Sequence, residues 1–344
     1  MDLPRLGVLL NAEYAAADLL RHGAYAEELG YRSFWYADVR FHRECYIGLT
    51  SVAMHTKRIL LATGVTDPYS RHPAITAASI ATLDELSGGR AVLGLGLGGA
   101  GFKELGIQKT LPIAALRESI GVIRRLWRGE EVTFDGKVIS LSKARLQFTP
   151  TRDSIPIYIA TQGEQISRLS GELADGVLIA NTVSQSGLEF YLRQIADGAA
   201  RVGRPASDID VNLRWEVCVS DDEAAAVRVM RRRLAQRMIS GYPHWGFLKQ
   251  LGVSVSSEFE AIAAKKDPAM LDAATEALPM EVVNGSVLAG NANRVAALIA
   301  PLLRREVRGV TIRPHACPGT GIEDVMRSFI QDVMPLAAKG RLVA

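Results

Sequence analysis

The sequence predicts an α/β protein of the (β/α)8-barrel, or TIM-barrel, class that forms one domain over residues 1–344. Short runs rich in Val, Ile and Leu alternate along the chain with longer amphipathic stretches. These short runs are apolar throughout, which is typical of parallel strands buried on both faces. Eight such alternations in 344 residues favour a closed barrel, with an open doubly wound sheet as the alternative.

The ends of the strands and helices follow from local residue patterns. Pro73 suits the first position of a helix, and Gly88 can close that helix because glycine readily adopts the left-handed conformation. Ser220 and Glu223, three positions apart, predict a capping box at the start of the seventh helix. The eight predicted strands are residues 6–10, 33–36, 59–63, 91–95, 155–160, 177–180, 210–219 and 309–313.

Two connections are longer than a simple barrel needs. Residues 103–111 and 129–150 lengthen the connection after the fourth strand, and residues 242–286 lie between the seventh helix and the eighth strand. Long connections in a compact domain are usually lids or functional insertions. We therefore expect insertions at these two places.

The composition indicates a globular protein with a small-molecule substrate. The chain is 48% hydrophobic and 22% charged, and its 40 basic and 37 acidic residues leave a net charge of +3. Such a balance predicts no binding to nucleic acid or to an anionic membrane.

The cysteines and the N-terminus indicate a cytoplasmic protein. Cys45, Cys218 and Cys317 are odd in number and contain no C-x-x-C pair, so neither a disulfide framework nor a cysteine zinc site is expected. No basic leader with a cleavage site precedes the first apolar run, and no run approaches membrane-spanning length.

A glycine-rich segment follows the fourth predicted strand. Gly94-Leu-Gly-Leu-Gly-Gly99 matches the G-x-G-x-x-G pattern of a dinucleotide-binding turn. A Rossmann turn opens directly into a helix, whereas this segment runs on through Phe102 to Leu111 before a helix begins near Pro112. We interpret Gly96 as a close approach of the backbone to a flat ligand, with a tight barrel turn as the alternative.

Polar residues follow the second and third strands as well. Asp38 and His42 are the candidate acid/base groups, because catalytic residues of barrels lie at the carboxyl ends of strands. A cap of the following helix is the alternative for Asp38. Asp67 precedes Pro68 and suits a turn, while Arg71 and His72 are interpreted as surface or helix-entry residues.

The turn after the fifth strand is a candidate phosphate site. The amides of Thr161, Gln162 and Gly163 precede a helix, and a helix N-terminus attracts anions. Glu164 would repel a phosphate, so this site needs a basic or hydroxyl group from elsewhere. His315 and Cys317 follow the eighth strand and are interpreted as pocket lining.

Several other chemistries have no motif in this chain. The sequence contains no G-x-x-x-x-G-K phosphate loop, no H-E-x-x-H zinc motif and no G-x-S-x-G nucleophile elbow.

Together these segments resemble the luciferase-like superfamily of flavin- and deazaflavin-dependent oxidoreductases, most closely its methylenetetrahydromethanopterin reductase group. The order and spacing match over nearly the whole chain, and residues 103–150 and 242–286 match least. The resemblance rests on residues 64–90 (GVTDPYSRHPAITAASIATLDELSGGR), 157–163 (IYIATQG), 171–181 (GELADGVLIAN) and 208–211 (DIDV).

The resemblance implies a barrel that binds FMN or the deazaflavin coenzyme F420 and forms a homodimer. It implies a non-prolyl cis peptide between Gly64 and Val65, beneath the ring of the cofactor. It also implies that Thr66 and Asp67 line the ring, that Thr161 to Gly163 bind the phosphate end and that Asn181 contacts the ribityl chain.

Two departures from the reductases favour oxygen chemistry. The reductases usually have Asp-His after the second strand and a glutamate in the first, whereas this chain has Asp38-Val39 and Leu9. Hydride transfer benefits from a polar neighbour that manages the accompanying proton, and valine cannot be one. An apolar wall instead protects a flavin peroxide from water.

The first hypothesis is accordingly an FMN-dependent monooxygenase. NAD(P)H, directly or through a separate flavin reductase, would supply the reduced FMN that reacts with oxygen and a small organic substrate. Deazaflavin-dependent hydride transfer is the second hypothesis, and a barrel that binds flavin without catalysis is the third.

Overall fold

The structure is a computed structural model that describes residues 3–341. It divides into two compact units, each described here by itself. The N-terminal unit comprises residues 5–178 and 194–211, and the C-terminal unit comprises residues 3–4, 179–193 and 212–341. The interpretation of the chain as one domain stays a prediction.

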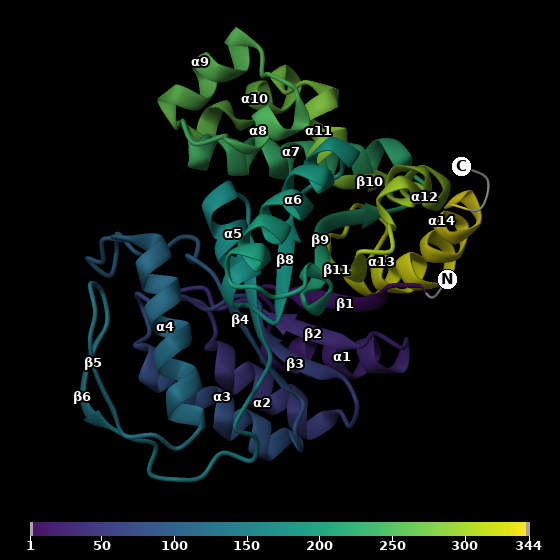
Figure 1. Ribbon diagram of the computed structural model, residues 1–344. Coiled ribbons are helices and arrows are strands. Elements are labelled where there is room, and N and C mark those ends of the chain that lie inside the picture. Colours follow the sequence, from purple (N-terminus) through teal and green to yellow (C-terminus); the bar gives the residue numbers. More distant parts are fainter. Residues whose placement is uncertain (1–2, 342–344) are drawn as a thin grey trace. The chain divides into compact units, whose positions relative to one another are not determined.

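Parallel strands form the sheet of the N-terminal unit (Figure 1). Leu10 pairs with Tyr36 and Tyr36 pairs with Thr63, so neighbouring strands end level with one another. The loops that follow these strands therefore emerge at one edge of the sheet. The strands, in their order across the sheet, are β1 (Arg5–Leu10), β2 (Ser33–Tyr36), β3 (Leu60–Thr63), β4 (Ala91–Leu95), β7 (Ile157–Thr161) and β8 (Gly176–Ala180).

A helix follows each of these strands. α3 begins at Pro73 and ends before Gly88, whose φ of 69° is left-handed, so both predicted ends of this helix are confirmed. α4 begins at Pro112, as expected. The helices are α1 (Ala16–Glu28), α2 (Cys45–His55), α3 (Pro73–Ser87), α4 (Pro112–Trp127), α5 (Glu164–Leu173) and α6 (Gln185–Arg201).

One apolar side chain from each of five strands packs on the same side of this sheet. Leu9, Trp35, Ala62, Val92 and Leu178 form a buried cluster. The first three of these lie directly opposite one another in neighbouring strands. Because successive side chains of a strand point to opposite faces, this cluster also fixes which residues face inward at the strand ends.

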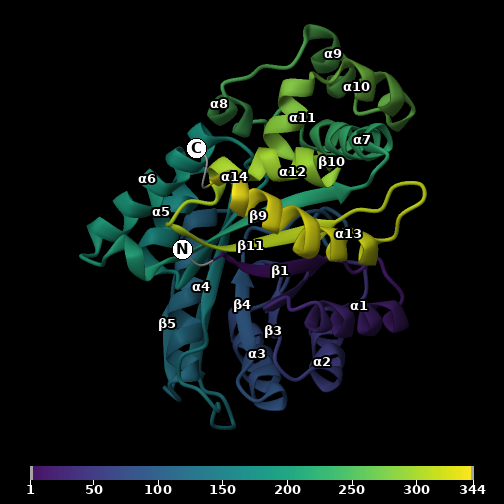
Figure 2. The ribbon, with the colours of Figure 1, turned by 90° about the vertical axis from the view of Figure 1, so that its right-hand side faces the viewer.

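Three parallel strands form the centre of the C-terminal unit (Figure 2). β9 (Asp210–Val219) lies between β10 (Leu288–Gly290) and β11 (Val307–Pro314). α7 (Glu223–Gly241) follows β9, and α12 (Ala292–Ile299), α13 (Ile322–Ser328) and α14 (Met334–Arg341) complete this part.

Four short helices form the second insertion. They lie within the segment 242–286 that the sequence predicts, and they pack on α7 around Met230, Phe259 and Val282. These helices are α8 (Phe247–Leu251), α9 (Ser257–Lys265), α10 (Leu271–Ala277) and α11 (Met280–Ser286).

The predicted (β/α)8-barrel fold is confirmed, since each predicted strand overlaps an observed strand and helices alternate with them. Three short strands were missed. β5 (Val132–Asp135) and β6 (Ser140–Ala144) form an antiparallel hairpin in the first insertion. Their side chains are mostly exposed and polar, so no apolar run marks them. β10 has only three residues.

The predicted cap of α7 is wrong. Asp222, rather than Ser220, is its N-cap and accepts a hydrogen bond from the Ala225 amide at 2.9 Å. Ser220 instead accepts one from the Asp222 amide at 3.2 Å. The Asp222 carboxylate reaches the first free amides of the helix directly, and Glu223 is its first residue.

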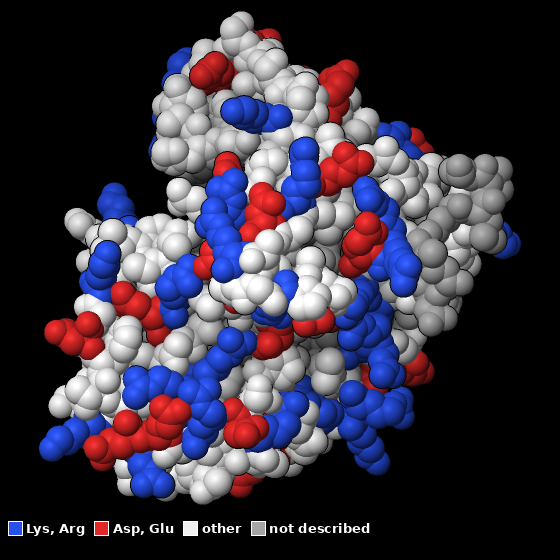
Figure 3. Space-filling view, in the orientation of Figure 1, with Lys and Arg blue, Asp and Glu red and all other residues white. Residues whose placement is uncertain are grey.

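Charges of both signs are interspersed over the face of the molecule in Figure 3.

No helix of residues 3–341 is both long and apolar enough to cross a bilayer. Within the same residues, no group of three or more His, Cys, Asp or Glu side chains is arranged to hold a metal ion. All three cysteines are buried free thiols.

The close contact of α5 and α6 provides a test of the fold. A methyl group at Gly198 would overlap the carbonyl oxygen of Arg168, so we expect Gly198→Ala to lower the free energy of unfolding by about 1–3 kcal/mol. Gly121 on α4 has open space around its Cα, and Gly121→Ala should raise that free energy by roughly 0.5–1 kcal/mol. Urea denaturation of both variants measures the difference, and equal effects would contradict the tight packing.

Candidate active site

The loops after β2, β3 and β4 continue the hydrogen-bonded ladder of the sheet beyond the strand ends. The Gly64 amide donates to the Tyr36 carbonyl at 2.7 Å, and the Thr66 amide donates to the Gly94 carbonyl at 3.0 Å. The Gly96 amide donates in turn to the Thr66 carbonyl at 2.9 Å. Residues 64–66 and 96 are thereby held as rigidly as a strand, which suits a binding surface.

Asp38 lies at this edge, two residues after β2. Its carboxylate accepts a hydrogen bond from the Thr66 hydroxyl at 2.6 Å, and Arg71 Nε lies 3.8 Å from the same oxygen. Burial raises the pKa of Asp38 above its ordinary value, although Thr66 and Arg71 partly oppose that rise. The carboxyl group of Asp38 is thus suited to exchange a proton at a higher pH than an exposed carboxyl group.

Arg71 is part of this site rather than a surface residue. Its guanidinium group lies 4.5 Å above the ring of Tyr46 and pairs with Glu44 at 2.6 Å. Its Nε is buried and finds no acceptor among residues 3–341. A buried donor without a partner is unfavourable, so this N–H is available to an oxygen of a ligand next to Asp38.

Asp67 has a different environment from Asp38. Its carboxylate is fully buried and accepts hydrogen bonds from the Tyr69 and Ser70 amides and from the Ser70 hydroxyl, all within 2.8 Å. It also forms an ion pair with Arg40 at 2.7 Å. These contacts hold the turn after β3, which is the structural role that its position before Pro68 suggests.

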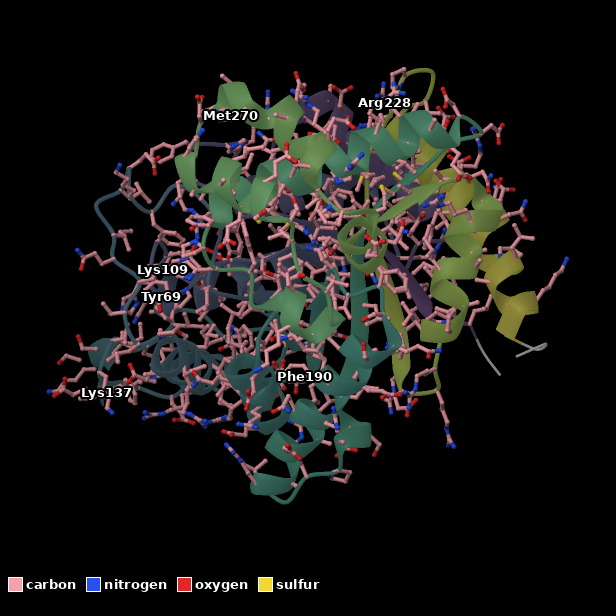
Figure 4. All side chains as sticks on the ribbon, turned by 90° about the horizontal axis from the view of Figure 1, so that it is seen from above. Tyr69, Lys109, Lys137, Phe190, Arg228 and Met270 are labelled. Atoms are coloured by element: carbon pink, nitrogen blue, oxygen red, sulfur yellow. The ribbon has the colours of Figure 1, made fainter. Side chains whose placement is uncertain are left out.

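Arg40 connects three loops of this edge. In addition to its ion pair with Asp67, it donates to the Ala100 carbonyl at 2.8 Å and lies 4.3 Å above the ring of Phe102. Tyr69 extends the same contact, because it packs edge-on against Phe102 and donates to the Thr110 carbonyl at 2.9 Å. Figure 4 labels Tyr69 beside Lys109, whose ammonium group lies 4.9 Å from the Phe102 ring.

The peptide between Gly64 and Val65 is cis, as the resemblance implies. The Val65 side chain packs against Gly94 and Gly96, and a methyl group at Gly96 would come within 2.7 Å of Val65 Cγ2. The Val65 side chain therefore leaves room only for a glycine at position 96, whether or not a ligand also approaches the Gly96 backbone.

Thr161 and Gly163 form the entry to α5. Thr161 is buried, and its hydroxyl group bonds to the Gly163 carbonyl at 3.0 Å and to the Ser167 hydroxyl at 2.9 Å. Gln162 is exposed and Gly163 faces open space. Glu164 pairs with Arg168 at 2.6 Å, which offsets its charge at the helix N-terminus.

Asn181 belongs to the C-terminal unit, directly after β8. It is buried with a left-handed φ of 56°, and its side-chain oxygen accepts a hydrogen bond from Arg214 at 2.8 Å. In the same unit, His315 Nε2 lies 3.3 Å from Glu216 Oε2. The Cys317 thiol and the Thr320 hydroxyl group form a hydrogen bond.

His42 stays a predicted acid/base candidate. Its imidazole is exposed on the turn before α2, and no hydrogen bond or ion pair of the Asp38 side chain involves it among the described residues. Arg40 is the residue that the sequence analysis missed. Arg71 lies at the entry to α3, as one of its two interpretations expected, but its side chain is half-buried beside Asp38. The available signal was their position in loops after neighbouring parallel strands that also carry Asp38 and Asp67.

The fold and this edge of the sheet define a barrel oxidoreductase of the luciferase-like type. Residues 1–308 match the family described as luciferase-like monooxygenase. The chain belongs to this family.

Curated relatives of this chain include a reductase and an F420-dependent dehydrogenase. The 5,10-methylenetetrahydromethanopterin reductase of Methanolobus tindarius is 39% identical over 227 residues, which are 65% of this chain and 68% of that protein. The F420-dependent glucose-6-phosphate dehydrogenase of Beutenbergia cavernae is 32% identical over 296 residues, which are 80% of this chain and 81% of that protein.

Solved structures separate into two groups. The coenzyme F420-dependent tetrahydromethanopterin reductase of Methanopyrus kandleri has a TM-score of 0.86 and 27% identity, covering 97% of this chain and 99% of that chain. A monooxygenase of Streptomyces bottropensis has a TM-score of 0.70 and 20% identity over 96% of this chain and 99% of that chain. The second likeness concerns the fold alone.

The role of Arg40 predicts the effect of its removal. We expect Arg40→Met to leave the Asp67 carboxylate buried without its ion pair, which costs about 3–5 kcal/mol. Amide hydrogen exchange should accelerate in residues 65–70 and 98–106, while the exchange rates of the other residues should stay unchanged. Arg43→Met is the matched control, since Arg43 is exposed and donates only to the Glu13 carbonyl in the described structure. Unchanged exchange in Arg40→Met would contradict this connection.

Proposed function

We propose that this chain is a deazaflavin-dependent oxidoreductase that transfers hydride between coenzyme F420 and a small organic substrate. The observation that carries the proposal is the agreement of sequence and fold with F420-dependent enzymes across the chain. The expectation of an FMN-dependent monooxygenase is not confirmed, because the solved monooxygenases resemble this chain in fold at low identity.

Leu9 and Val39 are the two apolar residues that favour oxygen chemistry in the sequence. Leu9 is buried in the strand cluster, where it packs beside Trp35 and Ala62. Its side chain therefore has a structural reason to be apolar. The valine at position 39 does not remove the neighbouring carboxyl group of Asp38. This carboxyl group has the environment of a group that exchanges protons.

The residues at this edge fit a deazaflavin ring. The Arg71 Nε–H is a buried donor without an acceptor, and the ring carries carbonyl oxygens of the kind that such a donor binds. Thr66 and the Gly64-Val65 backbone form the adjacent surface, and the open amide end of α5 suits the phosphate. The bound coenzyme would supply or accept the hydride.

Asp38 would hold the proton that accompanies the hydride. Thr66 orients its carboxyl group, and Arg71 adjusts its pKa from 3.8 Å away. In substrate reduction the protonated acid donates, and in substrate oxidation the carboxylate accepts. Tyr46 is buried, and the Asp38 side chain is only 15% exposed, which limits the access of water to its carboxyl group.

Cofactor titration tests the proposal. Quenching of F420 fluorescence should give a Kd at least about tenfold lower than that of FMN, equal to roughly 1.4 kcal/mol of selectivity. The same protein should then reduce or oxidise F420 under anaerobic conditions with a suitable substrate. Oxygen consumption with reduced FMN, together with no F420 binding, would support the monooxygenase instead. Binding of either cofactor without any turnover would support the non-catalytic barrel.

The raised pKa of Asp38 gives a pH dependence with a definite sign. In substrate reduction, kcat/KM should fall as the pH rises through the pKa of Asp38, because the acid form is lost. In the oxidation direction it should rise over the same interval. Asp38→Asn should remove this limb and lower kcat by about 10²–10⁴-fold.

Two further variants separate Asp38 from its neighbours. Thr66→Val removes the hydrogen bond that lowers the pKa of Asp38, so the limb should move to higher pH. His42→Ala should leave the position of the limb unchanged. A limb that disappears in His42→Ala and persists in Asp38→Asn would assign the proton to His42.

We also propose that the protein is a homodimer through the faces of α2 and α3. Ile47 and Met54 on α2 are 69% and 68% exposed, and Ile75 and Leu86 on α3 are 56% and 52% exposed. The two helices pack against each other, and each pair lies along one face of its helix. Exposed apolar surface of this kind indicates an interaction site. F420 chemistry does not require a separate flavin reductase, which belongs to the monooxygenase hypothesis alone.

Sedimentation velocity tests the dimer. The wild-type chain should sediment as a dimer at micromolar concentration, and the double variant Ile47→Glu, Met54→Glu as a monomer, because buried charges at an interface are unfavourable. Val202→Glu is the control, since Val202 is 51% exposed on the turn after α6 and belongs to neither α2 nor α3. A monomeric wild type would refute this surface.

A further inference from the structure

Three guanidinium groups and an imidazole surround one carboxylate in the C-terminal unit. Arg214 and Glu216 lie on the same face of β9, and Arg313 and His315 lie at the end of β11. Arg237 reaches them from α7. Each of the four basic side chains is within 4 Å of Glu216.

The geometry leaves most of these donors available. Arg237 donates to Glu216 Oε1 at 3.0 Å, whereas the nitrogens of Arg214 and Arg313 lie 3.6 and 3.7 Å from the same oxygen. Those two distances are too long for hydrogen bonds. A guanidinium group has five N–H donors, so both can bind a further oxygen.

The charge of this cluster is unbalanced. Three arginines share Glu216, which is only 8% exposed, while Arg214 and Arg313 are each 15% exposed. Burial would raise the pKa of Glu216, but His315 and the three arginines hold it well below its usual range. Burial lowers the pKa of Arg214 to about 10, so the arginine stays charged at neutral pH. Excess positive charge that is shielded from water is costly unless an anion compensates it.

Two neighbouring groups add polar atoms beside this cluster. Thr311 lies two residues before Arg313 on the same face of β11; it is fully buried, and its hydroxyl group has no partner among residues 3–341. Arg214 also donates to the side chain of Asn181, which the resemblance assigns to cofactor binding.

We propose that Arg214, Arg237 and Arg313 bind an anionic group of the substrate, a carboxylate or a phosphate, and that Glu216 is the internal counter-charge with which this group competes. The proposal rests on the proposed function in that it names the class of substrate. Glu216 keeps the three arginines in place before the substrate enters, and it limits the affinity for the anion by repulsion at short distance.

Anion binding to the coenzyme-free protein tests the site directly. Inorganic phosphate and succinate, titrated at constant ionic strength in a calorimeter, should bind in the millimolar range. Glu216→Gln should tighten binding by about tenfold, because the competing charge is removed while the shape is kept. Arg237→Met and Arg313→Met should each weaken it by about tenfold or more.

Arg228→Met is the matched control. Arg228 lies on α7 like Arg237 but is exposed, and Figure 4 labels it. The same loss of charge there should leave both anion affinities unchanged within about twofold, since exposed charges interact weakly. Thermal denaturation with and without phosphate shows whether each variant is folded, and Arg313→Lys replaces Arg313→Met if the latter is not.

F420 titration distinguishes a substrate anion from an anionic group of the coenzyme. For a substrate site, Arg313→Met leaves the Kd of F420 unchanged, and phosphate binds equally well to the F420-bound protein. A weakened F420 complex with competition by phosphate would assign the site to the coenzyme and overturn the proposal. Absence of anion binding to the wild type, or an unchanged affinity in Glu216→Gln, would also overturn it. Phosphate binding without F420 binding would refute the proposed function and leave the anion site in place.

Discussion

The buried ion pair of Arg40 and Asp67 is the interaction on which the candidate active site depends. Parallel strands that end level with one another bring three loops to one edge of the sheet, but this arrangement does not fix the loops themselves. Asp67 holds the turn after β3, and Arg40 attaches that turn to the loops after β2 and β4 through Ala100 and Phe102. Because both charges are shielded from water, neither can be lost without a large penalty.

Asp38 depends on this framework for its chemistry. Its carboxylate lies next to the backbone that Arg40 contacts, since Arg40 also donates to the Asp38 carbonyl at 3.2 Å. Two aspartates in neighbouring loops thus have different surroundings. Asp67 has its acceptor positions satisfied by amides, a hydroxyl and a cation, whereas Asp38 has one hydrogen bond and a distant cation. The difference in partners, rather than in residue type, leaves only Asp38 suited to proton exchange.

The sequence was sufficient for the elements that obey a strong local rule. The apolar runs of β2 and β4 were predicted with their observed ends, because strands buried on both faces tolerate few polar residues. The β5–β6 hairpin follows no such rule, since its side chains face solvent. Arg40 and Arg71 were not recognised as site residues because their partners lie 27 positions away in the sequence, and no local pattern encodes such a contact.

The interpretation of Leu9 and Val39 as signs of oxygen chemistry is not confirmed, and the packing gives a physical reason for another interpretation. The oxygen interpretation treated two positions as if their only purpose were to touch the cofactor. Leu9 is one of five side chains that pack the strands together, so its identity reports core packing before it reports chemistry. The capacity to exchange a proton is a property of a group in its surroundings, and Thr66, Arg71 and burial together provide it at Asp38. A missing histidine at position 39 therefore removes one neighbour of the carboxyl group and leaves in place the surroundings on which the proposed acid/base role of Asp38 rests.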